Sequence, residues 1–150
     1  MMRQVNQAGI ELVKKWESLR LKAYLCSAGK ATIGWGHTAG VVMGMQCSEA
    51  QAVAWLRADL AHAGEAVSRY ITVPLSDNQF AALVSFVFNA GRGALQTSTL
   101  RKKLNAGDYG AVPGQLWRWN KETKGGKKVV SQGLANRRAA EIELWNRNDG

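Results

Sequence analysis

The chain has few of the residues that build metal sites and disulfide scaffolds. Its 150 residues include two cysteines, Cys26 and Cys47, and two histidines, His37 and His62. Their spacing matches no zinc-ligand pattern, and two cysteines are too few for a fold held together by disulfides. We therefore expect no metal and no cofactor, and a fold that depends on a hydrophobic core.

Long hydrophobic runs are also missing. The longest hydrophobic run extends from Phe80 to Phe88 and is interrupted by Ser85. It is too short to span a bilayer. The first residues, Met-Met-Arg-Gln-Val-Asn-Gln, lack the apolar core and cleavage site of a signal peptide. We expect no stable insertion into a membrane, and another protein must release the chain if it acts outside the cytoplasm.

Acidic residues are the minority among the charged ones. Asp and Glu number 11 against 20 Lys and Arg, which gives a net charge of +9. Most of this excess lies in residues 76–150. A basic chain predicts an anionic partner. Nucleic acid, an anionic membrane and an acidic cell-wall polymer all satisfy this condition, so charge alone does not choose among them.

Hydrophobic residues make up 46% of the chain, enough for one folding unit with its own core. Asn6 is placed to cap a first helix, which carries an apolar stripe and ends near Glu17. Burial and the negative end of a helix both disfavour an ionised carboxylate, which suits a general acid. A solvated surface glutamate is the alternative for Glu17.

Residues 18–36 alternate between apolar and polar side chains around a turn at residues 27–30. This pattern predicts a short hairpin.

The remaining pattern is mainly helical. Val41-Val42 is a candidate third strand, and Ser48 starts a long helix that reaches Ile71. Ser76 starts the most apolar helix, and shorter helical segments follow. The remaining expectations are an interruption at Pro113-Gly114, an exposed loop from Asn120 to Gln132, and a last helix from Asn136 to Trp145. We predict an α+β, mainly α fold, with an N-terminal lobe at about 1–50, a connecting helix at about 48–71 and a helical C-terminal lobe at about 72–150.

One stretch carries a recognisable spacing. Glu17-x8-Cys26-x5-Thr32, within Leu-Arg-Leu-Lys-Ala-Tyr and Thr-Ile-Gly-Trp-Gly-His-Thr, resembles the catalytic stretch of phage-type lysozymes, the endolysins of glycoside hydrolase family 24. That family has Glu, eight residues, Asp or Cys, five residues, then Thr. The second half of the chain agrees in the same order, at residues 86–91, 98–100, 118–120 and 133–138.

The resemblance implies a lysozyme-like fold whose first helix packs on the C-terminal lobe. It also implies a muramidase that hydrolyses the β-1,4 bond between N-acetylmuramic acid and N-acetylglucosamine. Glu17 would be the general acid and Thr32 would hold the attacking water. Cys26, where Asp is common, would act as base or nucleophile, with its thiolate favoured by nearby cations such as Lys30. Alternatively, Cys26 only lines the site.

Further site residues also follow from the resemblance. Arg137 would pair with Glu17, or else with Glu141 one helical turn away. His37 and Asp59 would form a structural ion pair. Positions that line the saccharide cleft in the family are Thr38, Phe88 and Thr99. Phe88 could equally belong to the core, and the family's polar cleft residue falls near Pro113, which cannot supply an amide. Trp117 and Trp119 could stack on sugar, but tryptophans in a helical pattern more often belong to the core, which is what we expect for both.

Several alternatives stay open at this point. Cys47 reads as a small buried thiol, although a Cys26–Cys47 disulfide that silences the enzyme is conceivable. A lytic transglycosylase would act on the same bond with a single Glu. A basic nucleic-acid-binding domain and an inactive wall-binding module are other classes. The family implies a monomer that acts on bacterial peptidoglycan, is stored in the host cytoplasm, and is released to the cell wall by a separate holin.

Overall fold

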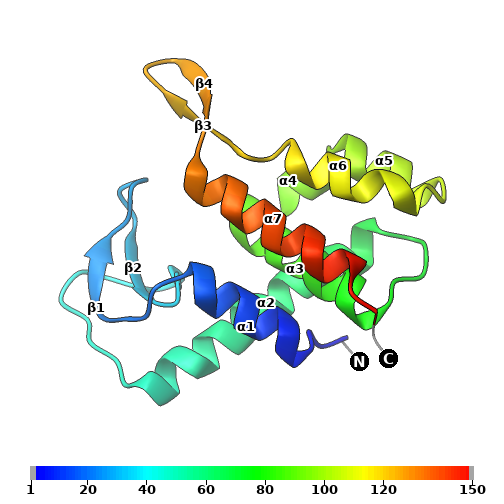
Figure 1. The fold of residues 1–150 in the computed structure, drawn as a ribbon. Coiled ribbons are helices and arrows are strands. Elements are labelled where there is room, and N and C mark those ends of the chain that lie inside the picture. Colours follow the sequence, from blue (N-terminus) through cyan, green and yellow to red (C-terminus); the bar gives the residue numbers. More distant parts are fainter. Residues whose placement is uncertain (1–2, 149–150) are drawn as a thin grey trace.

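The computed structural model describes residues 3–148. Its N-terminal half holds one helix, a hairpin and the longest helix, and its C-terminal half is mostly short helices around a central one (Figure 1). The elements are α1 (Gln7–Trp16), β1 (Arg20–Leu25), β2 (Ala31–Gly34), α2 (Glu49–Tyr70), α3 (Asp77–Ala90), α4 (Arg92–Gln96), α5 (Thr99–Asn105), a 3-10 turn η1 (Tyr109–Ala111), α6 (Val112–Trp117), β3 (Lys121–Lys124), β4 (Lys127–Val130) and α7 (Gln132–Asn146).

Helix α1 begins where the sequence predicts, directly after Asn6. The Asn6 side chain accepts the Gly9 N–H at 3.0 Å, which satisfies one of the free donors of the first turn. The backbone N–H of Glu17 donates to Val13 O and ends the helix. Helix α1 lies against α3 and α7, so the residue that follows it is held between both halves of the molecule.

The N-terminal sheet has two strands. Tyr24 pairs with Thr32 and Leu25 with Ala31, in an antiparallel register that becomes irregular toward Arg20. The predicted third strand at Val41-Val42 is wrong. Turns replace it, because Gly40 and Gly44 both have positive φ, and strand β1 instead makes an isolated bridge between Lys22 and Gln46.

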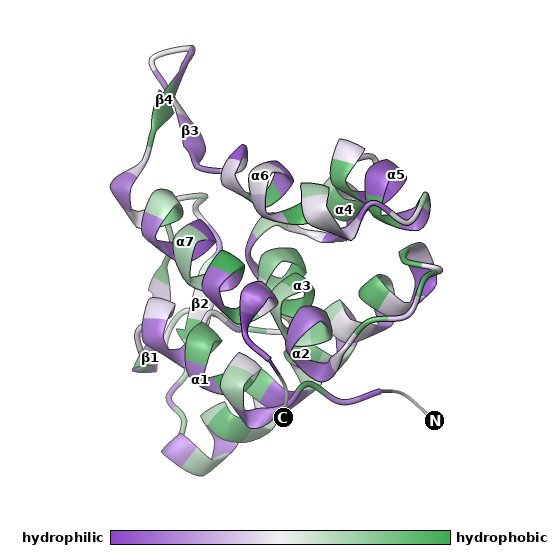
Figure 2. Ribbon diagram, turned by 45° about the vertical axis from the view of Figure 1, so that its right-hand side comes forward, coloured by the Kyte–Doolittle hydropathy of each residue, from purple (hydrophilic) through white to green (hydrophobic). Residues whose placement is uncertain are grey.

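Helices α2 and α3 form the middle of the molecule. Ser48 Oγ accepts the Gln51 N–H at 3.1 Å at the start of α2, and Ser76 with Gln79 makes a complete capping box for α3. Helix α3 is mostly apolar and lies against α2 and α7 (Figure 2). All of its residues from 80 to 87 are buried, so it forms the centre of the core.

Three expectations for the C-terminal half are wrong. Pro113 does not interrupt a helix, because it sits in the first turn of α6, where its missing N–H costs no hydrogen bond. Residues 120–132 are not only a loop, since β3 and β4 pair across Gly125-Gly126, both with positive φ. Helix α7 starts at Gln132, because Ser131 Oγ accepts the Leu134 N–H and caps it there.

The two tryptophans after α5 do not lie in the core. Trp117 is 47% exposed and Trp119 is 37% exposed, so the expectation that both belong to the core is wrong. Trp119 does touch the core at one edge, where its ring meets Phe86 at 5.4 Å between centroids in an edge-to-face arrangement. The rest of the Trp119 side chain is exposed to solvent.

Candidate active site

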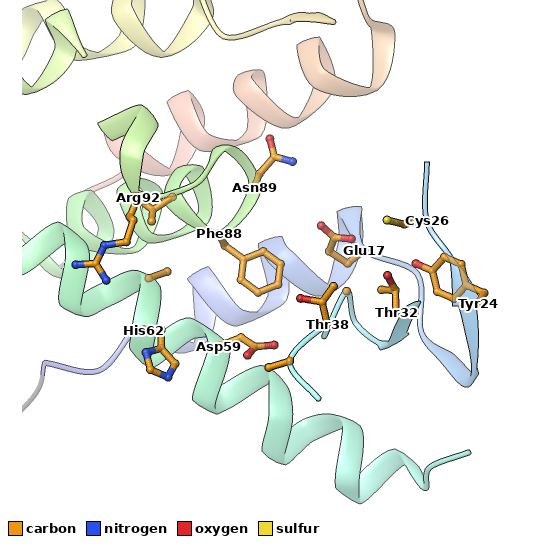
Figure 3. Close-up of a pocket in the computed structure, with 14 residues that line it drawn as sticks. Glu17, Tyr24, Cys26, Thr32, Thr38, Asp59, His62, Phe88, Asn89 and Arg92 are labelled. Atoms are coloured by element: carbon orange, nitrogen blue, oxygen red, sulfur yellow. The ribbon is translucent and has the colours of Figure 1, made fainter. Parts of the chain in front are cut away.

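Glu17, Cys26 and Thr32 come together in one cleft. Glu17 directly follows α1, Cys26 follows β1, and Thr32 lies on β2. Their side chains line a cavity of about 450 Å³ and point toward the same space (Figure 3). The hairpin register, which sets Tyr24 opposite Thr32, places these side chains beside the end of α1.

The Glu17 carboxylate is held from the C-terminal half of the chain. Arg137 Nη1 on α7 donates to Glu17 Oε1 at 2.9 Å, and the side chains are 4% and 26% exposed respectively. Gly36 closes the other side of the carboxylate. Its φ of +78° suits glycine, and an added Cβ would lie 3.3 Å from Glu17 Oε2. Both contacts fix where the carboxylate faces the cleft.

The surroundings of Cys26 favour its thiolate. The backbone N–H of Lys30, with smaller contributions from the N–H of Ala28 and the Thr32 hydroxyl, lowers the pKa of the Cys26 thiol. The cause is therefore backbone donors of the hairpin turn, whereas the sequence suggested nearby cationic side chains. That turn is fixed by Cys26 N–H donating to Lys30 O at 3.0 Å and Gly29 N–H donating to Cys26 O at 2.8 Å.

Thr32 has two possible acceptors for its hydroxyl proton. Its Oγ1 lies 3.0 Å from Lys30 O, and the Cys26 sulfur is within its reach. Thr32 is only 3% exposed, so its hydroxyl is fixed by the strand rather than free to rotate in solvent. A lone pair on Oγ1 remains available to accept a hydrogen bond from a water in the cleft.

His37 and Asp59 pair beside this site. His37 Nδ1 lies 2.8 Å from Asp59 Oδ2, and the imidazole stacks on Trp55 with 4.7 Å between ring centroids. His37 is buried, and it joins the loop after β2 to helix α2. Asp59 also lines the cleft, but its contact with His37 occupies one carboxylate oxygen.

The three predicted saccharide-binding residues are divided between two places. Thr38 and Phe88 line the same cleft as Glu17. Phe88 is half-buried, and its ring lies 5.9 Å from the Arg137 guanidinium. Thr99 does not join them, because it lines a separate depression of about 280 Å³ with Gln115, Arg118 and Trp119.

Comparisons with known proteins agree along almost the whole chain. Residues 14–141 match the model of the family described as phage lysozyme. The endolysin of Acyrthosiphon pisum secondary endosymbiont phage 1 is 43% identical over 141 residues, which are 94% of this chain and 97% of that protein. The chain belongs to the phage lysozyme family. This assignment confirms the predicted family, and with it an enzyme of the peptidoglycan-hydrolysing lysozyme class.

Solved structures of this family superpose closely on the chain. The endolysin of Escherichia coli O157:H7 phage FAHEc1 has a TM-score of 0.88 at 40% identity, covering 96% of this chain and 94% of that one. The muramidase domain of SpmX from Asticaccaulis excentricus has a TM-score of 0.92 at 35% identity, covering 97% and 99%. The mainly helical, lysozyme-like fold with a small N-terminal sheet that the sequence predicts is thereby confirmed.

Some relatives are longer proteins. The endolysin of Bacillus phage PZA is 43% identical over 146 residues, which are 95% of this chain but 55% of that protein. The chain therefore matches about half of that relative.

Residues that sequence reasoning missed also line the cleft: Tyr24, His62, Asn89 and Arg92. Asn89 directly follows Phe88 and Arg92 lies a few residues further along the chain, so their nearness to Phe88 was a usable signal. Gln115 was missed as well. It supplies, two residues after Pro113, an amide in the depression that contains Thr99.

Three further observations bear on the alternatives. Cys26 and Cys47 are both free thiols, and Cys47 packs against the core. Within residues 3–148, no group of three or more His, Cys, Asp or Glu side chains is arranged to hold a metal ion. Over the same residues, no helix has the length and apolar character needed to cross a bilayer.

Proposed function

We propose that this protein hydrolyses the β-1,4 bond between N-acetylmuramic acid and N-acetylglucosamine, and that it lyses a bacterial host at the end of a phage cycle. The observation that supports this most directly is the meeting of Glu17, Cys26 and Thr32 at one cleft. A carboxyl group, a thiol with lowered pKa and a fixed hydroxyl are the groups that a hydrolysis needs for acid, base and bound water.

In this proposal Glu17 protonates the glycosidic oxygen as the bond breaks. Arg137 fixes the carboxyl group through Oε1 at 2.9 Å, which leaves the other oxygen for the sugar. The proton for the leaving group therefore comes from a carboxyl group whose orientation is set by Arg137.

Cys26 takes the place of the second carboxylate. A free thiol has a pKa of about 8.5 and is only about 3% ionised at pH 7. The hairpin donors that lower the pKa of Cys26 raise this fraction. The thiolate accepts a proton from a water that Thr32 holds, or attacks the sugar directly, and either step uses an ionised sulfur.

The substrate of this proposal is bacterial peptidoglycan, bound along the cleft by Thr38 and Phe88. Thr99, Gln115 and Trp119 extend the contact into the neighbouring depression. His37 and Asp59 support the wall of the cleft without taking part in the chemistry. The protein acts as a monomer, is stored in the host cytoplasm, and depends on a separate holin for release to the wall.

A lytic transglycosylase is the second candidate. It is favoured by one observation about the two carboxyl groups that line the cleft, Glu17 and Asp59. Asp59 is paired with His37, which leaves Glu17 as a single acid for the reaction. Such an enzyme forms an anhydro sugar in place of a hydrolysed end. Mass spectrometry of digested peptidoglycan separates the two products, which differ by one water.

Turbidity loss of permeabilised cells tests the assignment of roles. We expect Glu17→Gln to lower the lysis rate by at least about 100-fold, because it removes a general acid. Cys26→Ala should lose a similar factor, while Cys26→Asp should retain activity because a carboxylate is a base at neutral pH. Circular dichroism must show each variant folded. Full lysis by Cys26→Ala would exclude an essential thiol, and full lysis by Glu17→Gln would exclude the proposed reaction.

A further inference from the structure

A buried group of charged side chains lies behind the cleft and takes no direct part in the proposed reaction. The two charged side chains are Arg138 and Glu141 on α7, which are 1% and 0% exposed, and the neutral hydroxyl of Ser85 on α3, 0% exposed, joins them. Charged side chains are almost never this deeply buried unless they are paired. The cost of burying them calls for a reason beyond packing.

Glu141 is the centre of this group. Ser85 Oγ donates to Glu141 Oε2 at 2.6 Å, and Arg138 Nη2 donates to the same oxygen at 3.1 Å. Arg138 Nε lies 2.8 Å from Glu141 Oε1 as an ion pair. Burial raises the pKa of Glu141, while Arg138, the Ser85 hydroxyl and Arg137 oppose this. The short contact from Ser85 is typical of a hydroxyl that donates to a carboxylate, so we assign Glu141 its negative charge.

Arg138 is the counter-ion of Glu141. Burial lowers the pKa of Arg138, an effect that Glu141 opposes, and a guanidinium stays protonated throughout the working pH range. Arg138 Nη2 also donates to Asn89 Oδ1 at 2.7 Å, and the guanidinium stacks over Phe86 at 5.2 Å. The cation thus touches a residue that lines the cleft.

Arg137 connects this group to the catalytic carboxyl. It gives Nη1 to Glu17 at 2.9 Å, and its Nε lies 3.7 Å from Glu141 Oε2. Among residues 3–148, its buried Nε and Nη2 atoms have no hydrogen-bond acceptor. The charge on this side of Arg137 is therefore balanced by Glu141 through space rather than by a directed hydrogen bond.

The four groups form a row of alternating sign: Glu17, Arg137, Glu141 and Arg138. Other titratable or charged groups that share the cleft with Glu17 are Tyr24 and Cys26 from the hairpin, Asp59 and His62 from α2, and Arg92 from α4. Asp59 and Arg92 have partners of their own in His37 and Glu65. Among residues 3–148, the direct ionic contact to Glu17 comes from Arg137 on α7.

We propose that Glu141 and Arg138 are positioning residues that set the protonation and orientation of Glu17 through Arg137. The inference rests on the proposed role of Glu17 as general acid. With both present, the charges of Glu141 and Arg138 largely offset each other at Glu17, and Arg137 is left to orient the carboxyl group. Ser85 anchors Glu141 so that this balance is fixed.

The proposal predicts shifts of opposite sign for the two charges. Glu141→Gln leaves two buried cations near Glu17, favours its ionised form and lowers its titration midpoint. Arg138→Met leaves Glu141 to oppose Arg137 and raises that midpoint. For unit charges roughly 10 Å apart at an effective dielectric constant of about 20, Coulomb's law gives about one pH unit in each direction.

The test is an NMR titration of side-chain carboxyl carbons in protein labelled at glutamate, with the Glu17 signal assigned by its loss in Glu17→Gln. Glu143→Gln is the matched control. It removes the same charge from the same helix, but Glu143 is 74% exposed and pairs with Arg147 on the surface, so its variant should leave the midpoint unchanged. Ser85→Ala changes no charge and should lower thermal stability with little shift.

Either single variant decides the matter, so one that fails to fold leaves the other as the test. Shifts of the same sign in both, or no shift in a folded variant, would overturn the proposal and leave only a structural role. The titration needs no substrate. If Glu17→Gln still lyses cells, the proposed reaction fails whatever the midpoints are, so the two failures are distinguishable.

Discussion

At the scale of single residues, Gly36 has no side chain, and this allows the backbone to lie close to the carboxylate of Glu17. Its backbone has a φ of +78°, and the nearest atom to an added Cβ is Glu17 Oε2 at 3.3 Å. We expect Gly36→Ala to destabilise the fold by about 1–2 kcal/mol because of its left-handed backbone, and to reduce lysis further because the methyl group displaces the carboxyl group.

Gly40 provides the matched control for this prediction. Its φ is +70°, so alanine meets the same backbone strain, but nothing lies within 4 Å of an added Cβ. Thermal denaturation should show similar losses for both variants, whereas turbidity assays should show a loss of rate, on the order of 10-fold or more, for Gly36→Ala alone. Equal lysis rates would mean that Gly36 does not position Glu17.

The site residues that the sequence predicts lie close together in the chain, whereas those that it misses depend on contacts between distant parts of the chain. The spacing of Glu17, Cys26 and Thr32 is local, so a hairpin places them without help from the rest of the fold. The contact between Arg137 and Glu17 spans 120 positions, and only the family resemblance suggested it. The sequence carried no signal for the burial of Arg138, because composition alone does not reveal its buried partner Glu141.

At the scale of elements, the local sequence pattern did not predict the β3–β4 hairpin, and its composition shows why. Its strands, Lys-Glu-Thr-Lys and Lys-Lys-Val-Val, contain many charged residues, which are depleted in strands. The Gly125-Gly126 turn decides the structure, because both residues adopt positive φ and such pairs favour two-residue hairpins. The helix periodicity of α2 and α3, by contrast, was long enough to predict both.

The two faces of this hairpin differ in charge. Cross-strand pairs Lys121 with Val130 and Thr123 with Lys128 share one face, which therefore carries two lysines and no acid. On the other face Glu122 lies 3.4 Å from Lys124. The hairpin projects away from the helices (Figure 1), so the first face is free to meet an anionic surface.

We expect the double variant Lys121→Gln, Lys128→Gln to bind purified cell walls more weakly. Its binding should also depend less on salt, because fewer charge–charge contacts with the wall remain for salt to screen. A cosedimentation assay at several ionic strengths measures this. Lys102→Gln with Lys103→Gln removes the same charge from exposed positions on α5 and serves as control. Equal loss in both pairs would indicate that only net charge matters.

At the scale of the whole molecule, the contact between α1 and α3 sets the place of Glu17, the proposed general acid. Gly9 lies at this join, where an added Cβ would meet Val5 Cγ2 and lie 2.9 Å from Ala81 Cβ. This role of Gly9 could not be predicted from the sequence, since a glycine within a helix usually weakens the helix. Here the close approach of two helices requires it, and α1 ends directly at Glu17.

Gly9→Ala should therefore destabilise the protein by about 1–3 kcal/mol through overpacking, despite the better helix propensity of alanine. Gly114→Ala in α6, where nothing lies within 4 Å, should instead stabilise by about 0.5–1 kcal/mol. Because Gly9→Ala pushes α1 away from α3, it should also slow lysis at temperatures where the protein is fully folded. Denaturant unfolding and lysis assays together measure both effects. A stabilised Gly9→Ala variant would show that the join adapts, and that the position of Glu17 is set by Arg137 and Gly36 instead.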